Sequence, residues 1–275
     1  MTVQQHISAD VQAQPRAVGD LQLSSKARGP LSAIDRFRTQ GCMKALFPRR
    51  AEGVEAIVIN TSGGLTGGDR LSLNCAAGEG SRLVLTTQAA ERAYRSAQGW
   101  ANVTTQLRVA AGGRIDWLPQ ELILFEGARL SRRLRADLDA DARLLLVEPV
   151  IFGRAAMGER LHDACLRDRI EVWRDGVPIY CDSIRLEGDL VDVMGRAAVG
   201  GGAGAMASLV YVGADAEAQR DALRRVLPRT AGASLLSDDV LVARVLAEDG
   251  FALRQVLLPA LDRLSGDGLP ISWRL

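Results

Sequence analysis

The sequence predicts a mostly β protein with two helices in its C-terminal part. From Gly53 to about Asp189, short apolar or alternating runs are separated by Gly, Asp or Pro, a pattern typical of consecutive strands. The stretches between these runs are too short for the amphipathic helices that a βαβ fold requires. Apolar residues recur at helical spacing only late in the chain. Together, these three observations favour an all-β architecture over α/β alternation.

The strand candidates are separated by turn signals, at 76–80, 110–113 and 139–141, where Gly, Ala and Asp cluster. The segment Ala89–Ser96 is a short helix candidate that does not change the fold class. The clearest strand candidates are Ala56–Ile59, Leu71–Leu73, Arg82–Leu85, Val103–Val109 and Leu144–Val147.

Two segments near the end of the chain carry helical periodicity, Asp215–Leu227 and Asp249–Leu264. Pro259 lies inside the second, and we expect it to kink or divide that helix because proline removes a backbone donor. The glycine-rich stretch Gly200–Gly204 is predicted to be a flexible loop. No lysine follows it, so it is not a phosphate-binding loop.

Length and charge narrow the possible functions. The 275 residues fit one domain, 1–275, of which 1–29 is predicted to be a flexible N-terminal segment. A formal net charge of +1, with Arg interspersed among Asp and Glu, argues against nucleic acid as a partner. No apolar run approaches the roughly 18–20 residues of a membrane span, and the first residues lack a secretion core. We therefore expect a cytoplasmic protein with no membrane partner.

The sequence predicts neither a catalytic site nor a permanently bound cofactor. Its two histidines lie far apart in sequence, and none of its cysteines forms a CxxC pair. Zinc knuckles, thioredoxin-type sites and acyl-transfer triads are therefore not indicated, and the cysteines are interpreted as apolar core residues or unreactive thiols. These cysteines are Cys42, Cys75, Cys165 and Cys181.

A glycine-rich segment spans Asn60–Leu71, where two glycine pairs flank Leu65 and Thr66 and are followed by Asp69. Glycine permits tight turns, and an aspartate there can accept hydrogen bonds from backbone amides. A strand-like run follows instead of a helix, so the segment is not a dinucleotide-binding fingerprint.

Five further blocks follow this segment, and in this order they resemble the UreD family of urease accessory proteins, also called UreH. The resemblance covers about Pro30 to Leu190 strongly and the rest of the chain weakly. It departs from the family at Thr61 and Ser62, where prolines are common. The blocks are Thr86–Ser96, which ends in Tyr-Arg-Ser, Asp116–Glu121 with Trp-Leu-Pro-Gln, Leu124–Ala128, Phe152–Glu159 and Arg169–Trp173.

The resemblance implies a helically wound, β-helix-like pair of antiparallel and mixed sheets with two appended helices. It also implies a urease maturation factor and not an enzyme. Family members act in a cytoplasmic complex with UreF and the GTPase UreG, bind the urease apoprotein, and help to deliver nickel to its active site.

Four acids in or near the matched blocks are candidates for a transient nickel path: Asp69, Glu91, Glu148 and Asp182. Carboxylates hold nickel less tightly than imidazole or thiolate, which suits a conduit that must release its metal. Glu148 stands out because it interrupts a long apolar run, where an unpaired carboxylate would be costly to bury. For each acid, a structural salt bridge or turn cap is the competing interpretation.

Two other functions stay open from the sequence. The chain could be a purely structural module that opens apo-urease without contacting nickel, since both roles need a stable β scaffold. It could also be a β-helical carbohydrate hydrolase that uses Glu121 and Glu126. Aromatic residues, the usual sugar platforms, make up only 4% of the chain, which disfavours the hydrolase.

Overall fold

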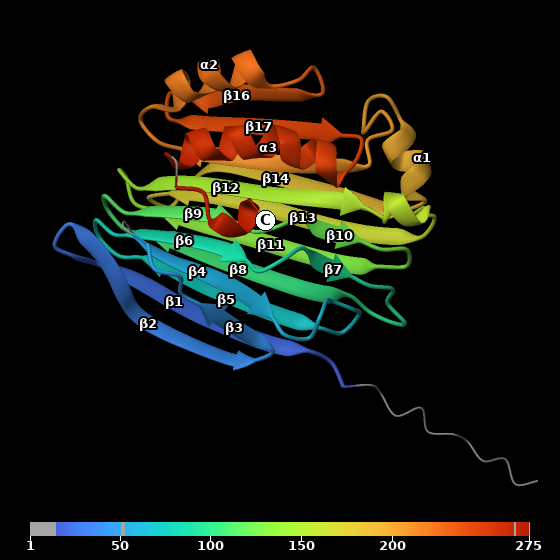
Figure 1. Ribbon diagram of the computed structural model, residues 1–275, viewed down its shortest axis with the longest axis horizontal. Helices are drawn as coiled ribbons and strands as arrows, with labels where there is room; N and C mark the ends of the chain where they lie inside the picture. The colour runs from blue at the N-terminus through green and yellow to red at the C-terminus, as the bar shows by residue number, and fades with distance from the viewer. Residues whose placement is uncertain (1–14, 51–52, 267, 275) are drawn as a thin grey trace, which may run out of the picture.

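The computed structural model describes residues 15–50, 53–266 and 268–274, which form two stacked sheets (Figure 1). The seven-stranded sheet has the order β14 (Val177–Gly188), β13 (Ala164–Arg174), β11 (Arg129–Leu138), β8 (Ala101–Val109), β5 (Arg70–Ala77), β1 (Val18–Arg28) and β2 (Leu31–Gly41). The ten-stranded sheet has the order β16 (Ala231–Ser237), β17 (Val240–Ala247), β15 (Ala205–Val212), β12 (Arg143–Phe152), β9 (Arg114–Leu118), β6 (Arg82–Thr87), β4 (Val54–Asn60) and β3 (Met43–Leu46). Beside β12, it also holds β10 (Leu122–Leu124), which pairs with β7 (Glu91–Ala93).

The chain winds between the two sheets as a coil. It passes from β4 to β5 and back to β6, and the same crossing recurs through β8, β9, β11 and β12. Neighbouring turns of the coil pair in parallel, as β5 does with β8 and β6 with β9. Antiparallel partners close the ends of both sheets, as β2 does for β1. The predicted fold class, mostly β with helically wound mixed sheets, is confirmed.

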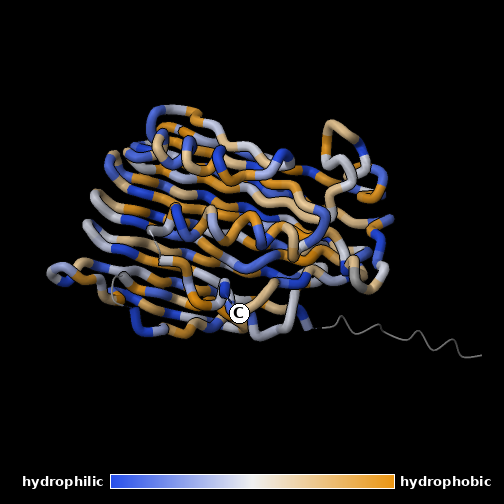
Figure 2. Tube along the Cα trace, turned by 45° about the horizontal axis from the view of Figure 1, so that its top comes forward, coloured by the Kyte–Doolittle hydropathy of each residue, from blue (hydrophilic) through white to orange (hydrophobic). Residues whose placement is uncertain are grey.

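Two apolar cores result from side chains that alternate along the strands. One lies between the sheets and includes Leu21 and Leu83; the other lies between the ten-stranded sheet and the C-terminal helices and includes Leu257 and Trp273. β12 contributes to both cores, which explains its continuous apolar run. Figure 2 shows hydrophobic and hydrophilic residues interleaved along many of the strands.

Both predicted C-terminal helices are confirmed as α2 (Ala216–Val226) and α3 (Gly250–Ser265). Pro259 lies inside α3 without dividing it. A short helix, α1 (Leu190–Gly195), and two 3-10 turns, η1 (Ala155–Met157) and η2 (Ile271–Trp273), were not predicted. The Gly200–Gly204 stretch lies in the loop between α1 and β15, as expected. None of the helices in the described residues is long and apolar enough to cross a membrane.

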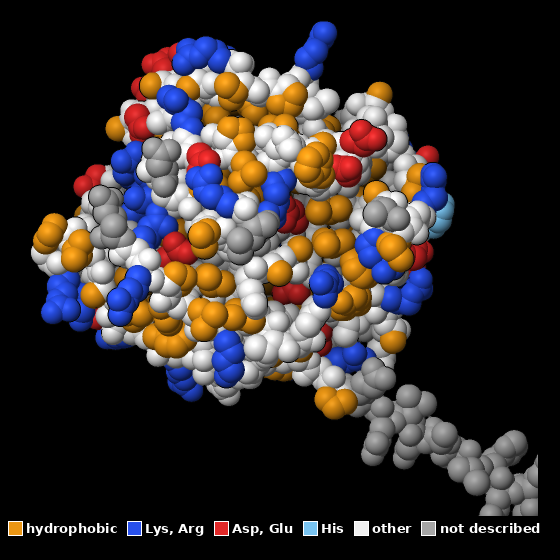
Figure 3. All heavy atoms as spheres, viewed as in Figure 1, with side chains coloured by type: hydrophobic (Ala, Val, Ile, Leu, Met, Phe, Trp, Pro, Cys, Tyr) orange, Lys and Arg blue, Asp and Glu red, His pale blue; other side chains and the backbone are white. Residues whose placement is uncertain are grey.

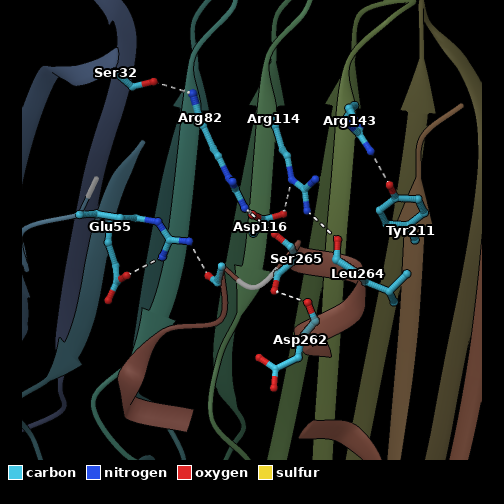
Figure 4. A network of polar contacts seen from close by, with 12 residues as sticks. Ser32, Glu55, Arg82, Arg114, Asp116, Arg143, Tyr211, Asp262, Leu264 and Ser265 are labelled. Carbon is cyan, nitrogen blue, oxygen red and sulfur yellow. Dashed lines mark hydrogen bonds and ion pairs between the residues drawn. The ribbon is translucent and has the colours of Figure 1, made fainter. Parts of the chain in front are cut away.

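Arginines from the ten-stranded sheet hold the C-terminal end of α3 (Figure 4). Arg82 and Arg114 both bind the fully buried carboxylate of Asp116, at 2.9 and 2.7 Å. Arg114 also donates to the Leu264 carbonyl and Arg82 to the Ser265 carbonyl, each at 2.8 Å. The last carbonyls of a helix have no partner within it, so these bonds satisfy groups that would otherwise be buried unpaired.

Three sequence predictions were wrong in detail. Strands begin at Val18 and continue after Asp189, beyond the predicted limits. Residues 18–28, placed in the predicted flexible segment, form β1, which pairs with both β2 and β5; the first 14 residues lie outside the described part. Ala89–Ser96 is not a helix, because Glu91–Ala93 pairs with β10 as β7.

Candidate functional site

A cavity of about 240 Å³ lies between the two sheets. Its wall is largely apolar, with Leu71 and Leu73 from β5 and Leu134 from β11. It approaches the surface at the β6–β7 connection, where Gln88 and Ala89 are exposed. The cavity is therefore an internal space with a mouth on the side of the coil where β6 ends.

The cavity coincides with a break in the ten-stranded sheet. β12 pairs with β9 up to Leu146 and with β10 only from Val150 onward. Between these points β12 has no strand partner on that side among the described residues. Pro149 fits there because proline lacks the N–H that a ladder would require. The break places Glu148 in the cavity wall.

Glu148 belongs to a polar cluster inside this apolar space. Its Oε1 accepts a hydrogen bond from Trp117 Nε1 at 2.7 Å, and its Oε2 accepts one from Arg132 Nη1 at 2.6 Å. The same guanidinium binds Asp168 through Nη2 at 2.5 Å and Nε at 3.3 Å. All four side chains line the cavity, and both carboxylates are buried.

The cluster carries excess negative charge. Two carboxylates share one guanidinium, which gives a formal charge of −1 when both acids are ionised. Burial raises the pKa of Glu148, and the attraction of Arg132 opposes that rise while Asp168 adds to it. The two acids hold the Arg132 pKa above its ordinary value, against the effect of burial. A cation entering the cavity would be attracted to this cluster.

Glu91 lies near the mouth of the same cavity. Its Oε2 accepts a hydrogen bond from Asn60 Nδ2 at 3.1 Å, and its Oε1 accepts one from the Arg92 backbone amide at 3.1 Å. Desolvation raises the Glu91 pKa, although both hydrogen bonds lower it. The structure thus brings Glu91 and Glu148, two of the four sequence-predicted acids, to one cavity.

Asp69 and Asp182 are not among the residues that line this cavity. Asp69 is buried in the glycine-rich turn and accepts the backbone amides of Ala17 and Thr66 at 2.8 and 2.7 Å, as a turn cap would. Asp182 on β14 binds Arg244 on β17 at 2.5 Å, across the end of the sheet stack.

Sequence reasoning missed Arg132 and Asp168. Strand alternation could have found both, because Arg132 is in phase with buried Leu134 on β11 and Asp168 with buried Ile170 on β13. Gln120 was missed as well. Its Oε1 accepts a hydrogen bond from Arg254 at 2.6 Å, and its buried Nε2 on the cavity wall has no partner among the described residues.

Three of the sequence blocks meet at the cavity. The glycine-rich segment contributes Asn60 and Leu65, the Thr86–Ser96 block contributes the mouth, and the Trp-Leu-Pro-Gln block contributes Trp117 and Gln120. Segments far apart in the sequence therefore build one internal site.

The two acids considered for a hydrolase do not form such a site. Glu121 binds Arg254 of α3 at 2.8 Å, while Glu126 accepts the Asp163 backbone amide at 3.1 Å. Neither is among the cavity-lining residues. Within the described part of the chain, no group of three or more His, Cys, Asp or Glu is arranged to hold a metal ion.

Comparison with known proteins gives one family. The family described as UreD urease accessory protein matches residues 17–271. A protein named urease accessory protein UreD from Roseobacter denitrificans is 51% identical over 95% of this chain and 96% of its own length. Similar proteins with the same name come from Ruegeria pomeroyi, 49% identical over 93% of this chain and 100% of its own length, and from Chelativorans sp., 44% identical over 94% and 95%. The chain therefore belongs to the UreD family of urease accessory proteins.

Proposed function

We propose that this chain is a non-enzymatic scaffold that joins UreF and UreG in the cytoplasm, binds the urease apoprotein, and passes nickel through the cavity between its sheets. Family membership supports a role in urease maturation. The observation that carries the nickel path is the buried Glu148–Arg132–Asp168 cluster, with its formal charge of −1, inside a cavity whose mouth holds Glu91.

The chemistry of the cavity wall suits passage better than storage. The described residues that line it include carboxylates but no His or Cys, the side chains that retain nickel most tightly. The negative charge of the Glu148–Arg132–Asp168 cluster lowers the energy of a divalent cation beside it. The other charged side chains on the cavity wall are Glu91, Arg92 and Arg133. Glu91 and Glu148 are therefore the proposed path residues. A nickel role for Asp69 and Asp182 stays a prediction.

The proposal is tested by reconstituting urease activation from purified components. Apo-urease, UreF, nickel-loaded UreG and GTP are mixed with or without this chain, and the nickel bound to re-isolated urease is measured. We expect loading to depend on the chain. Equal loading without it would contradict the proposal.

A purely structural role is the second candidate, because every oxygen of Glu148 already has a partner within the fold. A cavity-filling variant separates the two functions. Val103→Phe adds bulk to the cavity wall, and overpacking of this kind costs about 1–3 kcal/mol. The matched control is Thr104→Phe, whose side chain is exposed next to it in the sequence.

If nickel passes through the cavity, Val103→Phe binds UreF and apo-urease normally but lowers nickel loading, while Thr104→Phe changes neither. If the chain only opens apo-urease, both variants support normal loading once their binding is shown to be intact.

A further inference from the structure

The two ends of the sheet stack are closed differently. At the β14 end, ion pairs join the sheets: Asp182 with Arg244 at 2.5 Å, and Arg174 with Asp239 at 2.6 Å. At the β2 end, aromatic rings close the gap. Phe37 of β2 packs edge-on against Phe47, just after β3, with ring centroids 4.9 Å apart.

Apolar side chains at this β2 end are exposed to solvent. Leu31 is 52% exposed, Ile34 38%, Phe37 42% and Leu46 57%. The β-bulge in the β1–β2 pair brings Ile34 opposite Ser25 and Phe37 opposite Leu23, so both lie on the face that points between the sheets. Ile34 and Phe37 form what we call the β2 patch, whereas Leu31, opposite Arg28, and Leu46, opposite Ile57, point to the outer faces of the two sheets. Grouped exposed apolar side chains of this kind mark interaction sites.

The patch lies beside a free strand edge. β2 has eleven residues and, within the described part of the chain, pairs only with β1, so its other edge presents backbone donors and acceptors that no described strand pairs with. Proteins usually keep such edges short or cover them. A long edge next to apolar side chains is the surface that an added strand from another chain requires.

The charge around this edge is strongly positive. Six exposed Lys and Arg side chains surround it, and they include both lysines of the chain. Asp35, the only acid in the β2 sequence, is already bound to Lys26 at 3.0 Å. Figure 3 shows hydrophobic and Lys or Arg side chains interleaved along the lower margin of the molecule. The cations are Lys26, Arg28, Arg36, Arg38, Lys44 and Arg49.

We propose that β2 and its patch dock an extended, acidic segment of a partner protein, which adds to the seven-stranded sheet as an edge strand. Backbone hydrogen bonds would run along β2, apolar side chains of the segment would cover Ile34 and Phe37, and its acids would meet the surrounding cations. A second copy of this chain fits poorly, because pairing two β2 edges would bring two sets of cations together.

The test uses a fluorescently labelled peptide of about eleven residues in which Glu and Val alternate, a length that matches β2. The full chain is titrated into it at low salt, and fluorescence anisotropy gives the Kd. We expect saturable binding that weakens with added salt. Two variants, Phe37→Glu and Arg38→Glu, should each weaken it at least about tenfold. Hydrogen exchange should show the peptide protecting amides of β2.

The matched control is Leu236→Glu on β16, an edge strand of the other sheet, where the side chain is 56% exposed. This variant should leave the Kd unchanged. Arg38 is exposed, so its variant keeps the test valid even where Phe37→Glu perturbs packing.

Three outcomes would overturn the proposal. The first is that the Glu-Val peptide does not bind at about 1 mM, and the second is that it binds both β2 variants as tightly as the unaltered chain. The third is that sedimentation shows the chain alone to dimerise through Phe37, which would make a second copy the occupant.

Discussion

Replacing Glu148 by Gln removes one charge from the cavity cluster and keeps its shape. The Gln carbonyl can still accept a hydrogen bond from Trp117 Nε1, which now meets Glu148 at 2.7 Å. Arg132 keeps both of its hydrogen bonds to Asp168, so no buried charge loses its partner. The Gln NH2 then faces Arg132 Nη1, which loses the acceptor it now has at 2.6 Å. We therefore expect the free energy of unfolding to fall by about 1–3 kcal/mol.

The effect on a passing cation should be larger. The formal charge of the cluster changes from −1 to 0. A divalent cation about 5 Å from one negative charge gains roughly 7 kcal/mol at an effective dielectric of about 20, before its own desolvation is counted. Even a fifth of this, about 1.4 kcal/mol, would slow passage tenfold if it appeared in the barrier.

The assay follows three quantities on one preparation: thermal stability, assembly with UreF and UreG, and the nickel content of activated urease. The matched control is Glu171→Gln, which makes the same change on the outer face of β13, where Glu171 binds Arg169 at 2.7 Å. We expect Glu148→Gln to lower the rate of nickel loading at least about tenfold, and the control to leave it unchanged.

Normal nickel loading by a stable, fully assembled Glu148→Gln variant would refute the reasoning. Loss of stability together with assembly would instead show that Glu148 acts as a structural ion-pair partner. Arg132→Met provides the reference for that result, because it leaves two buried carboxylates without their cation and should cost about 3–5 kcal/mol.

Three further predictions follow from the polar contacts. Asp182→Asn breaks a partly exposed ion pair with Arg244, so thermal denaturation should show a loss of about 1 kcal/mol or less. It should lower nickel loading far less than Glu148→Gln does. Equal losses of nickel loading in the two variants would extend the path to Asp182. Asp116→Ala leaves two arginines at the α3 end without their buried acid, and chemical denaturation should show a loss of about 3–5 kcal/mol, with a smaller loss for Asp116→Asn. The pKa of Glu91 is raised in the folded protein, so its contribution to stability falls as the pH rises from the ordinary pKa of 4.5 towards the folded one. Glu91→Gln should therefore flatten the fall of the free energy of unfolding with pH, measured by denaturation at several pH values. An unchanged dependence on pH would contradict this.

The sequence alone determined the type of most elements. In a strand, every second side chain points to the same face, so apolar residues that face the core recur at every second position. Runs with this alternation, such as Val103–Val109, therefore predicted β8 directly. Helical spacing predicted α2 and α3 for the same reason. The order of the sequence blocks predicted the family, which the comparisons confirmed. The continuous apolar run around Glu148 indicated that this acid needs a partner if buried.

The partners themselves were decided only by the tertiary structure. Arg132 and Asp168 sit opposite each other because β11 and β13 pair in parallel at one register, 36 residues apart in sequence. Asp69 caps a turn through the Ala17 amide, 52 residues away, and β1, where Leu21 and Leu23 alternate with polar residues, takes its place in the sheet by pairing with β2 and β5. Local periodicity specifies which way a side chain points, whereas its neighbours depend on register between distant strands. The cavity follows the same rule, because it exists where β12 changes partner from β9 to β10.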